Sequence, residues 1–229
     1  MSDQFRNLLA IETSTRELTL ALSFGDDRLV KSHELVERSH GQVIARKVAN
    51  LFDSAGLERR DLNGIVVSTG PGSFTGLRIG LAFAKGMASA LQIPVVGVSL
   101  FELAAHKYGS GFRDFFAVVR VRKDELLVAR ILDSRVNLND VTSVAVETAG
   151  QSIGLVPAIG LGLDIRQFVP EARLIDGQSS LEFDPADLLQ IGRTRMTEGR
   201  GDTLSSLEPL YIQKSQAEIK WDLRHPKGA

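Results

Sequence analysis

Apolar and polar positions alternate along the first quarter of the chain in a way that predicts strands followed by a helix. The run Leu8–Glu12 and the period-two stretch Leu18–Leu22 are typical of a hairpin, and Arg28–Leu35 is typical of a third strand. From Val43 to Ala55 apolar residues recur at helical spacing, and Gly56 stands where a helix C-cap is expected. The pattern therefore predicts three strands and then an amphipathic helix.

The next fifty residues continue with alternating strand and helix patterns. A buried strand is predicted at Ile65–Val67, a helix at Phe74–Leu91 and another strand at Val95–Val98. Ser99, with a glutamate three residues later, forms a capping-box pattern that predicts a third helix, ending near Tyr108. The order of three strands, helix, strand, helix, strand and helix is that of a ribonuclease-H-like half-domain.

After Gly109-Ser110-Gly111 the pattern begins again with weaker signals. A second hairpin is predicted, followed by three weak strands and a helix that opens at Asp184-Pro185. These segments are 115–121, 125–132, 144–146, 156–159, 173–175 and 185–195. We therefore expect an α/β protein of two ribonuclease-H-like half-domains, 1–108 and 109–213, with a polar tail at 214–229 that either packs back or is disordered.

Composition narrows the classes of function. The 229 residues carry 27 basic and 28 acidic side chains, so the chain is not a polycation that coats nucleic acid. The absence of cysteine excludes a disulfide framework and a thiolate nucleophile. The apolar run near the start is interrupted by Glu12 and is too short for a signal segment or a membrane span. We expect a cytoplasmic protein with no membrane partner.

The segment Thr69–Arg78 joins a predicted buried strand to a helix, a place where backbone N–H groups often meet phosphates. It lacks the lysine of a P-loop and the third glycine of a dinucleotide-binding loop. A tight turn capped by Ser73 is one interpretation. The other is contact with a nucleotide or anion through Gly72, Ser73 and Thr75.

Four small residues stand four positions apart in the second predicted helix: Gly76, Gly80, Ala84 and Ala88. An interior glycine costs a helix about 1 kcal/mol relative to alanine, and close approach of another helix would offset that cost. The approaching helix belongs either to the same chain or to a partner. The partner hypothesis predicts a wider interface that also includes Arg78, Lys85, Val48, Leu51 and Phe52.

Glu12 ends the first predicted strand and precedes Thr13-Ser14-Thr15. This segment resembles the phosphate-facing hairpin of the sugar kinase, heat-shock chaperone and actin superfamily, whose active members use an acidic side chain there to position metal and phosphate. A capping or surface role is the alternative. No histidine pair has the i, i+4 spacing of a helical metal site, so no metal centre is expected.

Several strings together resemble the TsaB (YeaZ) family, and the most specific is Gly70–Gly80. Pro209–Ile212 is similar to the closing strand of that family. The chain departs from the family pattern at Glu12, where Asp is common, and at Arg120–Arg122, where Asp-Ala-Arg is usual. The other matching strings are Leu9–Ser14, Arg38–His40, Ala55–Leu57, Ala84–Gly86 and Ile93–Ser99.

The resemblance implies a non-catalytic paralogue of the enzyme TsaD that forms a heterodimer with it through the first two helices. It further implies that the ATPase TsaE joins this heterodimer, with ATP or ADP near the junction and no cofactor on the chain alone. The complex would transfer a threonylcarbamoyl group to the adenosine beside the anticodon of tRNAs reading codons that begin with A. In isolation the exposed face would form a homodimer.

A second hypothesis from the residues is a small nucleotide-dependent kinase or carbamoyl transferase that uses Glu12 and the Gly70–Gly76 loop. It is an enzyme, whereas the interaction subunit is by itself not one. The two hypotheses differ in where the informative residues lie. The first needs the small helix residues at the surface, and the second needs Glu12 at a ligand site.

Overall fold

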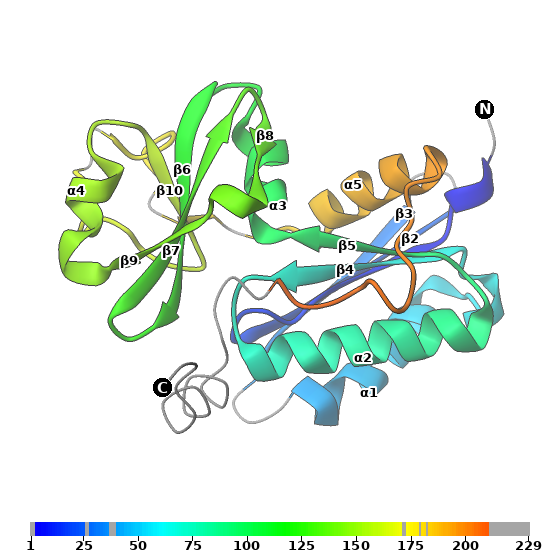
Figure 1. Cartoon of the computed structure of the whole chain (residues 1–229). Helices are drawn as coiled ribbons and strands as arrows, with labels where there is room; N and C mark the ends of the chain where they lie inside the picture. Colours follow the sequence, from blue (N-terminus) through cyan, green and yellow to red (C-terminus); the bar gives the residue numbers. More distant parts are fainter. Residues whose placement is uncertain are drawn as a thin grey trace, which may run out of the picture.

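The structure is a computed structural model, and it describes residues 3–25, 28–36, 40–170, 173–178, 180–181 and 183–210. The predicted polar tail at 214–229 and the end of the closing strand at 211–212 lie outside these residues, as does most of the string at 38–40. The described chain forms two lobes side by side, each built on one sheet (Figure 1).

The first lobe is built on a five-stranded sheet in the order β3-β2-β1-β4-β5. Strands β1, β2 and β3 are antiparallel neighbours, whereas β4 runs parallel to both β1 and β5. This order confirms the three-strand meander and the two later strands predicted from the sequence. The strands are β1 (Leu8–Glu12), β2 (Glu17–Phe24), β3 (Arg28–Leu35), β4 (Gly64–Gly70) and β5 (Val95–Ser99).

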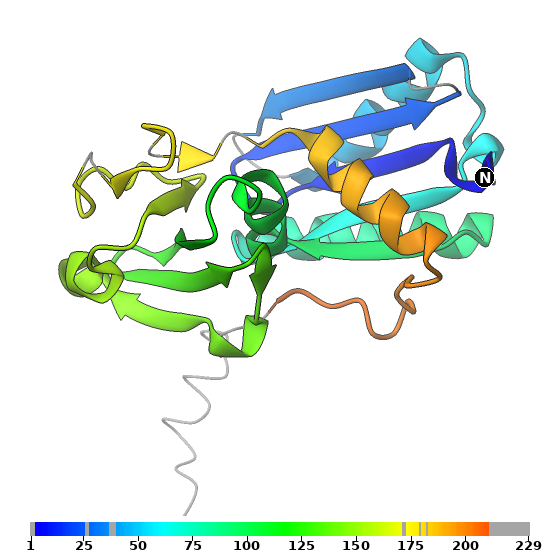
Figure 2. The same cartoon turned by 90° about the horizontal axis from the view of Figure 1, so that it is seen from above.

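Helices cover both faces of this sheet because β1 and β4 are apolar on both sides. Leu9 and Ile11 pack under helices α1 and α2, and Leu8 and Ala10 belong to the core under α3 and α5. Figure 2 shows α5 crossing one face of the strands. The helices are α1 (His40–Ala55), α2 (Phe74–Leu91), α3 (Leu100–Tyr108) and α5 (Pro185–Thr197), with short 3₁₀ helices at Asp3–Phe5 and Arg59–Asp61.

Local capping fixes where these helices begin and end. The Ser73 side chain accepts a hydrogen bond from Gly76 N at the start of α2, and Ser99 and Glu102 form the predicted capping box of α3. Asp184 caps α5, and Gly56 follows α1 with a positive φ of 66°. The sequence signals for helix ends are therefore confirmed.

The second lobe repeats the topology of the first. Its sheet has the order β11-β10-β6-β7-β8, with β9 also paired to β7, so an antiparallel meander again lies beside two parallel strands. The predicted strand at 173–175 is wrong, because Leu174 and Ile175 make only isolated bridges. The elements are β6 (Asp114–Arg122), β7 (Glu125–Leu132), β8 (Arg135–Val136), β9 (Thr142–Ala145), β10 (Ala158–Leu161), β11 (Ser180–Leu181), α4 (Ala149–Ile153), and 3₁₀ helices Leu138–Asp140 and Val146–Thr148.

The predicted second half-domain, 109–213, extends too far at its C-terminal end. Helix α5 packs on the first sheet, where Leu188 and Leu189 join Leu8 and Val66 in one core. Beyond it, residues 200–210 run along the first lobe. Asp202 N donates to Val95 O at 2.9 Å, and Leu210 N donates to Thr69 O at 2.8 Å. The second lobe is therefore formed by the described residues from 113 to 181, and the described residues from 183 to 210 belong to the first lobe.

Helix α3 lies at the junction of the lobes. Phe101 and Tyr108 share one buried core with Val98 of the first sheet and Phe115 and Ile131 of the second. The Tyr108 hydroxyl donates to Gln178 Oε1 at 2.7 Å. One continuous core therefore runs from the first sheet through α3 into the second.

Candidate functional site

An open cleft with a volume of about 1070 Å³ lies between the two lobes. The turn after β1 and the N-terminal end of α2 form one wall, and strand β6 with the ends of β10 and β11 forms the other. Of the predicted nucleotide or anion contacts, Gly72, Ser73 and Thr75 line this cleft. The cleft residues with ionisable side chains are Arg16, Glu17, His33 and Arg120.

Glu12, the fourth predicted contact, does not line the cleft and is only 1% exposed. Its Oε1 accepts hydrogen bonds from the backbone N and the hydroxyl of Ser14, and its Oε2 is buried without a hydrogen bond in the described structure. Burial raises the pKa of this carboxyl above its ordinary value, and the bonds from Ser14 lower it less. The prediction that Glu12 contacts a ligand in the cleft is therefore wrong for this conformation, since the carboxyl closes the turn from inside.

The turn after β1 is held against the start of α2. Ser73 N donates to Ser14 O at 2.6 Å, and a Cβ on Gly72 would overlap with the same oxygen. Ser73 thus confirms the predicted cap and at the same time tethers the helix to the hairpin turn. Phe74, at 39% exposure, begins the helix, with the Arg78 guanidinium 3.8 Å from its ring centroid.

The small residues that the partner hypothesis placed at an interface lie inside the chain. A Cβ on Gly76 would overlap with the backbone oxygen of Thr13, and a Cβ on Gly80 would overlap with Thr13 Oγ1. Ala84 is fully buried, and Ala88 is 2% exposed. The two glycines are therefore required by the crossing of the hairpin turn, and the prediction that these four residues face a partner is wrong.

The three predicted interface residues of α1 are also buried. Val48, Leu51 and Phe52 are each at most 3% exposed and pack against the sheet with Leu9 and Ile11. An amphipathic helix turns its larger apolar side chains toward the sheet, so these residues are core rather than surface. They cannot contact a partner without unfolding of the lobe.

Two predicted interface residues remain accessible, and they indicate the outward face of α2. Arg78 is exposed and Lys85 is half-buried. Ala82, Gly86 and Ala90 continue the line of Arg78 at four-residue spacing, and all three are exposed. We call these four residues the outer ridge. The sequence contained a signal for this face. Ala82, Gly86 and Ala90 repeat the four-residue spacing of Gly80, Ala84 and Ala88, two positions further along the helix.

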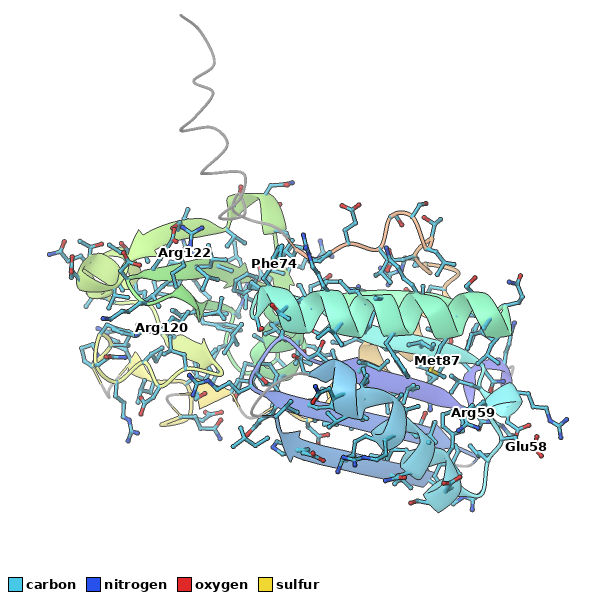
Figure 3. All side chains as sticks on the ribbon, turned by 90° about the horizontal axis from the view of Figure 1, so that it is seen from below. Glu58, Arg59, Phe74, Met87, Arg120 and Arg122 are labelled. Atoms are coloured by element: carbon cyan, nitrogen blue, oxygen red, sulfur yellow. The ribbon has the colours of Figure 1, made fainter. Side chains whose placement is uncertain are left out.

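The outer ridge is bordered by larger apolar side chains. Ile79, Phe83 and Met87 are half-buried along α2 and pack against the core that α1 shares. Figure 3 looks onto this face, with Phe74 at the end of α2 beside the second lobe and Met87 toward the other end. A Cβ on Gly86 would meet no atom within 4 Å. The fold of the chain itself therefore does not require a glycine there.

The described residues contain no group of three or more His, Cys, Asp or Glu side chains that could hold a metal ion. Among the same residues, no helix has both the length and the apolar character needed to cross a membrane.

Comparison with known proteins shows which sequences this chain resembles. Residues 33–176 match the family model described as TsaD, tRNA N6-adenosine threonylcarbamoyltransferase. "tRNA threonylcarbamoyladenosine biosynthesis protein TsaB" of Escherichia coli (strain K12) is 40% identical over 93 residues, which span 40% of this chain and only 39% of that relative. The Bacillus subtilis (strain 168) protein of the same description is 28% identical over 93% of this chain and 97% of the relative.

Solved structures give the same result over most of the chain. YeaZ from Pseudomonas aeruginosa superimposes with a TM-score of 0.69 at 26% identity, covering 90% of this chain and 99% of that one. A P. aeruginosa protein described as uncharacterized, with similarity to peptidase YEAZ, gives a TM-score of 0.71 at 28% identity and the same coverage.

The paired three-strand meanders and the cleft between them define a two-lobed protein of the sugar kinase, heat-shock chaperone and actin superfamily. The family model, the curated relatives and the solved structures then narrow the class. This chain belongs to the TsaB/YeaZ family, within the broader group that the TsaD model describes.

Proposed function

We propose that this chain is a non-catalytic subunit that docks on a TsaD protein through the outward face of α1 and α2 and activates it, together with TsaE. The complex would make threonylcarbamoyladenosine beside the anticodon of tRNAs that read codons beginning with A. The names of the relatives support a role in that biosynthesis. Docking rests on an observation in this chain, the exposed outer ridge.

The outer ridge supports docking because no contact within the chain requires a glycine at position 86. Gly76 and Gly80 make room for Thr13, but Gly86 stands over open space, in a helix that would gain about 1 kcal/mol from alanine. Ala82 and Ala90 on either side keep the surface low, so a partner helix can approach closely between the larger flanking side chains. In the absence of TsaD, the same face would pair two copies of the chain as a homodimer.

The buried position of Glu12 favours the subunit over the transferase hypothesis. A kinase or carbamoyl transferase would need this carboxylate at the cleft, where it could position a metal or a phosphate. Instead, Glu12 is only 1% exposed, and its carboxylate accepts hydrogen bonds from Ser14. No other observation in the described structure favours an enzyme that acts through the Gly70–Gly76 loop.

The test is binding of purified chain to TsaD of the same organism, with Ala82→Glu as the variant. A charged side chain on the ridge should reduce affinity at least about 10-fold, because a buried unpaired carboxylate is costly at an interface. Thr194→Glu places the same side chain on an exposed position of α5, across the sheet, and should bind as the wild type does. Unfolding midpoints of all three proteins should agree within about 2 °C.

If folded Ala82→Glu protein binds TsaD as tightly as the wild type, the outer ridge is not the docking face. Rates of threonylcarbamoyl transfer by TsaD with TsaE and tRNA provide the second measurement. They should fall with Ala82→Glu and not with Thr194→Glu. Equal rates with and without the chain would overturn the activating role.

A further inference from the structure

Strand β3 forms an open edge of the first sheet. It is the last strand in the order β3-β2-β1-β4-β5, and no other described strand pairs with its outer side. Its eight residues, Arg28–Leu35, pair with β2 without a register shift, and none of them is proline. Natural sheet edges are usually short, bulged, interrupted by proline or covered, because an open edge can pair with another chain. The regular edge of β3 is therefore a candidate interaction surface.

Alternate residues of β3 direct their backbone groups to the open edge. Val36 N donates to Arg16 O at 3.0 Å, in the same register that pairs Leu35 with Glu17. Hydrogen-bonded pairs alternate with non-hydrogen-bonded pairs in an antiparallel ladder, so the even-numbered residues of β3 bond to β2. The backbone N–H and C=O of the odd-numbered residues therefore point away from β2. These residues are Leu29, Lys31, His33 and Leu35.

The side chains of these four residues are exposed on the sheet face opposite helix α1. Val30 packs against the core under α1, so strand alternation directs the odd-numbered side chains to the other face. Figure 2 shows β3, in blue, at the outer edge of the sheet, beside the strands that α5 crosses. Leu35 is 61% exposed and Leu29 is 39% exposed. Exposed apolar side chains on an open edge strand favour association with another chain.

The spacing of the two leucines makes this edge complementary to itself. Leu29 and Leu35 stand at equal distances along the chain from Ser32. In an antiparallel pairing of two copies about an axis at Ser32, Leu29 of one copy lies opposite Leu35 of the other, and Lys31 lies opposite His33. All four residues have outward backbone groups, so each opposing pair can exchange hydrogen bonds in both directions. The backbone and the side chains therefore favour the same register.

The basic side chains of the edge do not oppose this pairing. Lys31 Nζ lies 2.6 Å from Asp184 Oδ2, and His33 Nε2 lies 3.1 Å from Glu17 Oε2. Like charges that face each other across two strands are destabilising, but each of these basic groups already has a carboxylate beside it. Lys31 of one copy can therefore approach His33 of the other without uncompensated positive charge.

We propose that two copies of this chain pair through the outer edge of β3, in a two-fold antiparallel arrangement about Ser32 that joins their five-stranded sheets into one. A second copy is the occupant because the two-fold axis uses every outward backbone group of the edge and covers both leucines of both copies. The edge is separate from the outer ridge on α2. The pairing therefore does not depend on the docking proposal.

Sedimentation equilibrium of full-length Ala82→Glu protein tests this edge, because that substitution disrupts pairing through the outer ridge. We expect dimers with a dissociation constant on the order of 10–100 μM, since one pair of edge strands is a small interface. Adding Leu29→Lys and Leu35→Lys together places like charges opposite each other and should weaken dimerisation at least about 10-fold. Adding Leu29→Lys with Leu35→Glu places opposite charges there and should restore it.

The control for these charges is Leu155→Lys, which changes a leucine that is 75% exposed on the second lobe and should not affect dimerisation. All the substituted leucines are exposed, so the variants should keep the melting curve of the parent protein.

A single cysteine tests the register directly, because the natural chain contains none. Ser32 would lie opposite Ser32 of the second copy in a non-hydrogen-bonded pair, where Cα atoms are about 4.5 Å apart. This separation allows a disulfide, so Ser32→Cys protein should form a covalent dimer on mild oxidation. Ser152→Cys, at an exposed position of α4 on the second lobe, is the matched control and should stay largely monomeric.

Three results would contradict the pairing. They are monomeric Ala82→Glu protein at millimolar concentration, unchanged dimerisation of the folded double-lysine variant, and a yield of covalent dimer from Ser32→Cys no higher than from Ser152→Cys. A lysine–glutamate variant that dimerises no better than the double-lysine variant would exclude the register about Ser32. None of these measurements involves TsaD, so their failure is distinct from failure of docking.

Discussion

A pair of glycine substitutions in α2 distinguishes its inner face from its outer face. Gly80→Ala and Gly86→Ala make the same chemical change in the interior of the same helix. At Gly86 the new methyl group meets no atom within 4 Å, and at Gly80 it overlaps with Thr13 Oγ1 and lies 3.3 Å from Thr13 Cβ and Cγ2. The difference between the two variants therefore isolates packing against the hairpin turn.

The expected magnitudes follow from helix propensity and overpacking. Both variants gain about 1 kcal/mol from replacing an interior helical glycine. Overpacking costs about 1–3 kcal/mol, and an overlap this deep calls for the upper end. Gly86→Ala should therefore be about 1 kcal/mol more stable than the wild type and Gly80→Ala about 2 kcal/mol less stable. For a chain of this size, the midpoints should differ by roughly 6–12 °C.

Urea unfolding followed by circular dichroism measures both free energies, and an unchanged slope with denaturant confirms that the unfolding reaction is the same. Thr13→Ala removes the obstructing hydroxyl, so Gly80→Ala made in that background should lose most of its cost. The coupling energy in this double-mutant cycle should be about 2–3 kcal/mol. Stabilisation by Gly80→Ala equal to that by Gly86→Ala would refute the burial of the inner face and restore it as a candidate interface.

Two further substitutions and one control test the buried turn and the return of the chain to the first lobe. Burial raises the pKa of Glu12 above its ordinary value of 4.5, so folding favours the protonated carboxyl. This contribution to stability is fully present below pH 4.5 and is lost as the pH rises through the folded-state pKa. Glu12→Gln should therefore gain stability relative to wild type between pH 4 and pH 8 in urea titrations, and a pH-independent difference would contradict this. Leu207→Ala should cost about 2–5 kcal/mol, because Leu207 is 2% exposed beneath β5. Leu204→Ala, at 39% exposure, should stay within about 0.5 kcal/mol of wild type, and equal effects of the two would refute the packing of 200–210.

The order of elements in the first lobe could be predicted from the sequence because its signals are local. A helix was expected at Phe74–Leu91 and the structure has the same bounds, since Ser73 caps one end and the apolar spacing stops at the other. The capping box at Ser99 was recognisable for the same reason. Such signals depend on residues a few positions apart, so one sequence suffices.

The orientation of α2 could not be predicted in the same way. Periodicity identifies residues that share a helix face, but α2 has two lines of small residues, and each suits a close approach. The inner line faces the chain itself because Thr13 packs against Gly76 and Gly80. Thr13 lies more than sixty positions before these glycines, and only the folding of the sheet brings it to them. The burial of Glu12 could have been predicted from the sequence. Strand alternation places its side chain on the same face as Leu8 and Ala10, and that face is covered.

The return of α5 to the first lobe was not predictable from local pattern either. Asp184-Pro185 marks a helix start, but capping signals carry no information about the sheet on which the helix packs. Its position depends on long-range contacts, such as the 2.9 Å bond from Arg195 Nη1 to Gly97 O, which joins residues 98 positions apart. No local signal in the sequence therefore indicates that the second half-domain ends before residue 213.

Helix α2 belongs both to the wall of the interlobe cleft and to the outer ridge, and this constrains how each can work. Its N-terminal end lines the cleft through Ser73 and Thr75, and its outward face carries the ridge around Gly86. The tether from Ser73 N to Ser14 O and the packing of Gly80 on Thr13 fix the helix to the hairpin turn. A partner on the ridge therefore contacts a helix that cannot shift unless the cleft wall shifts with it.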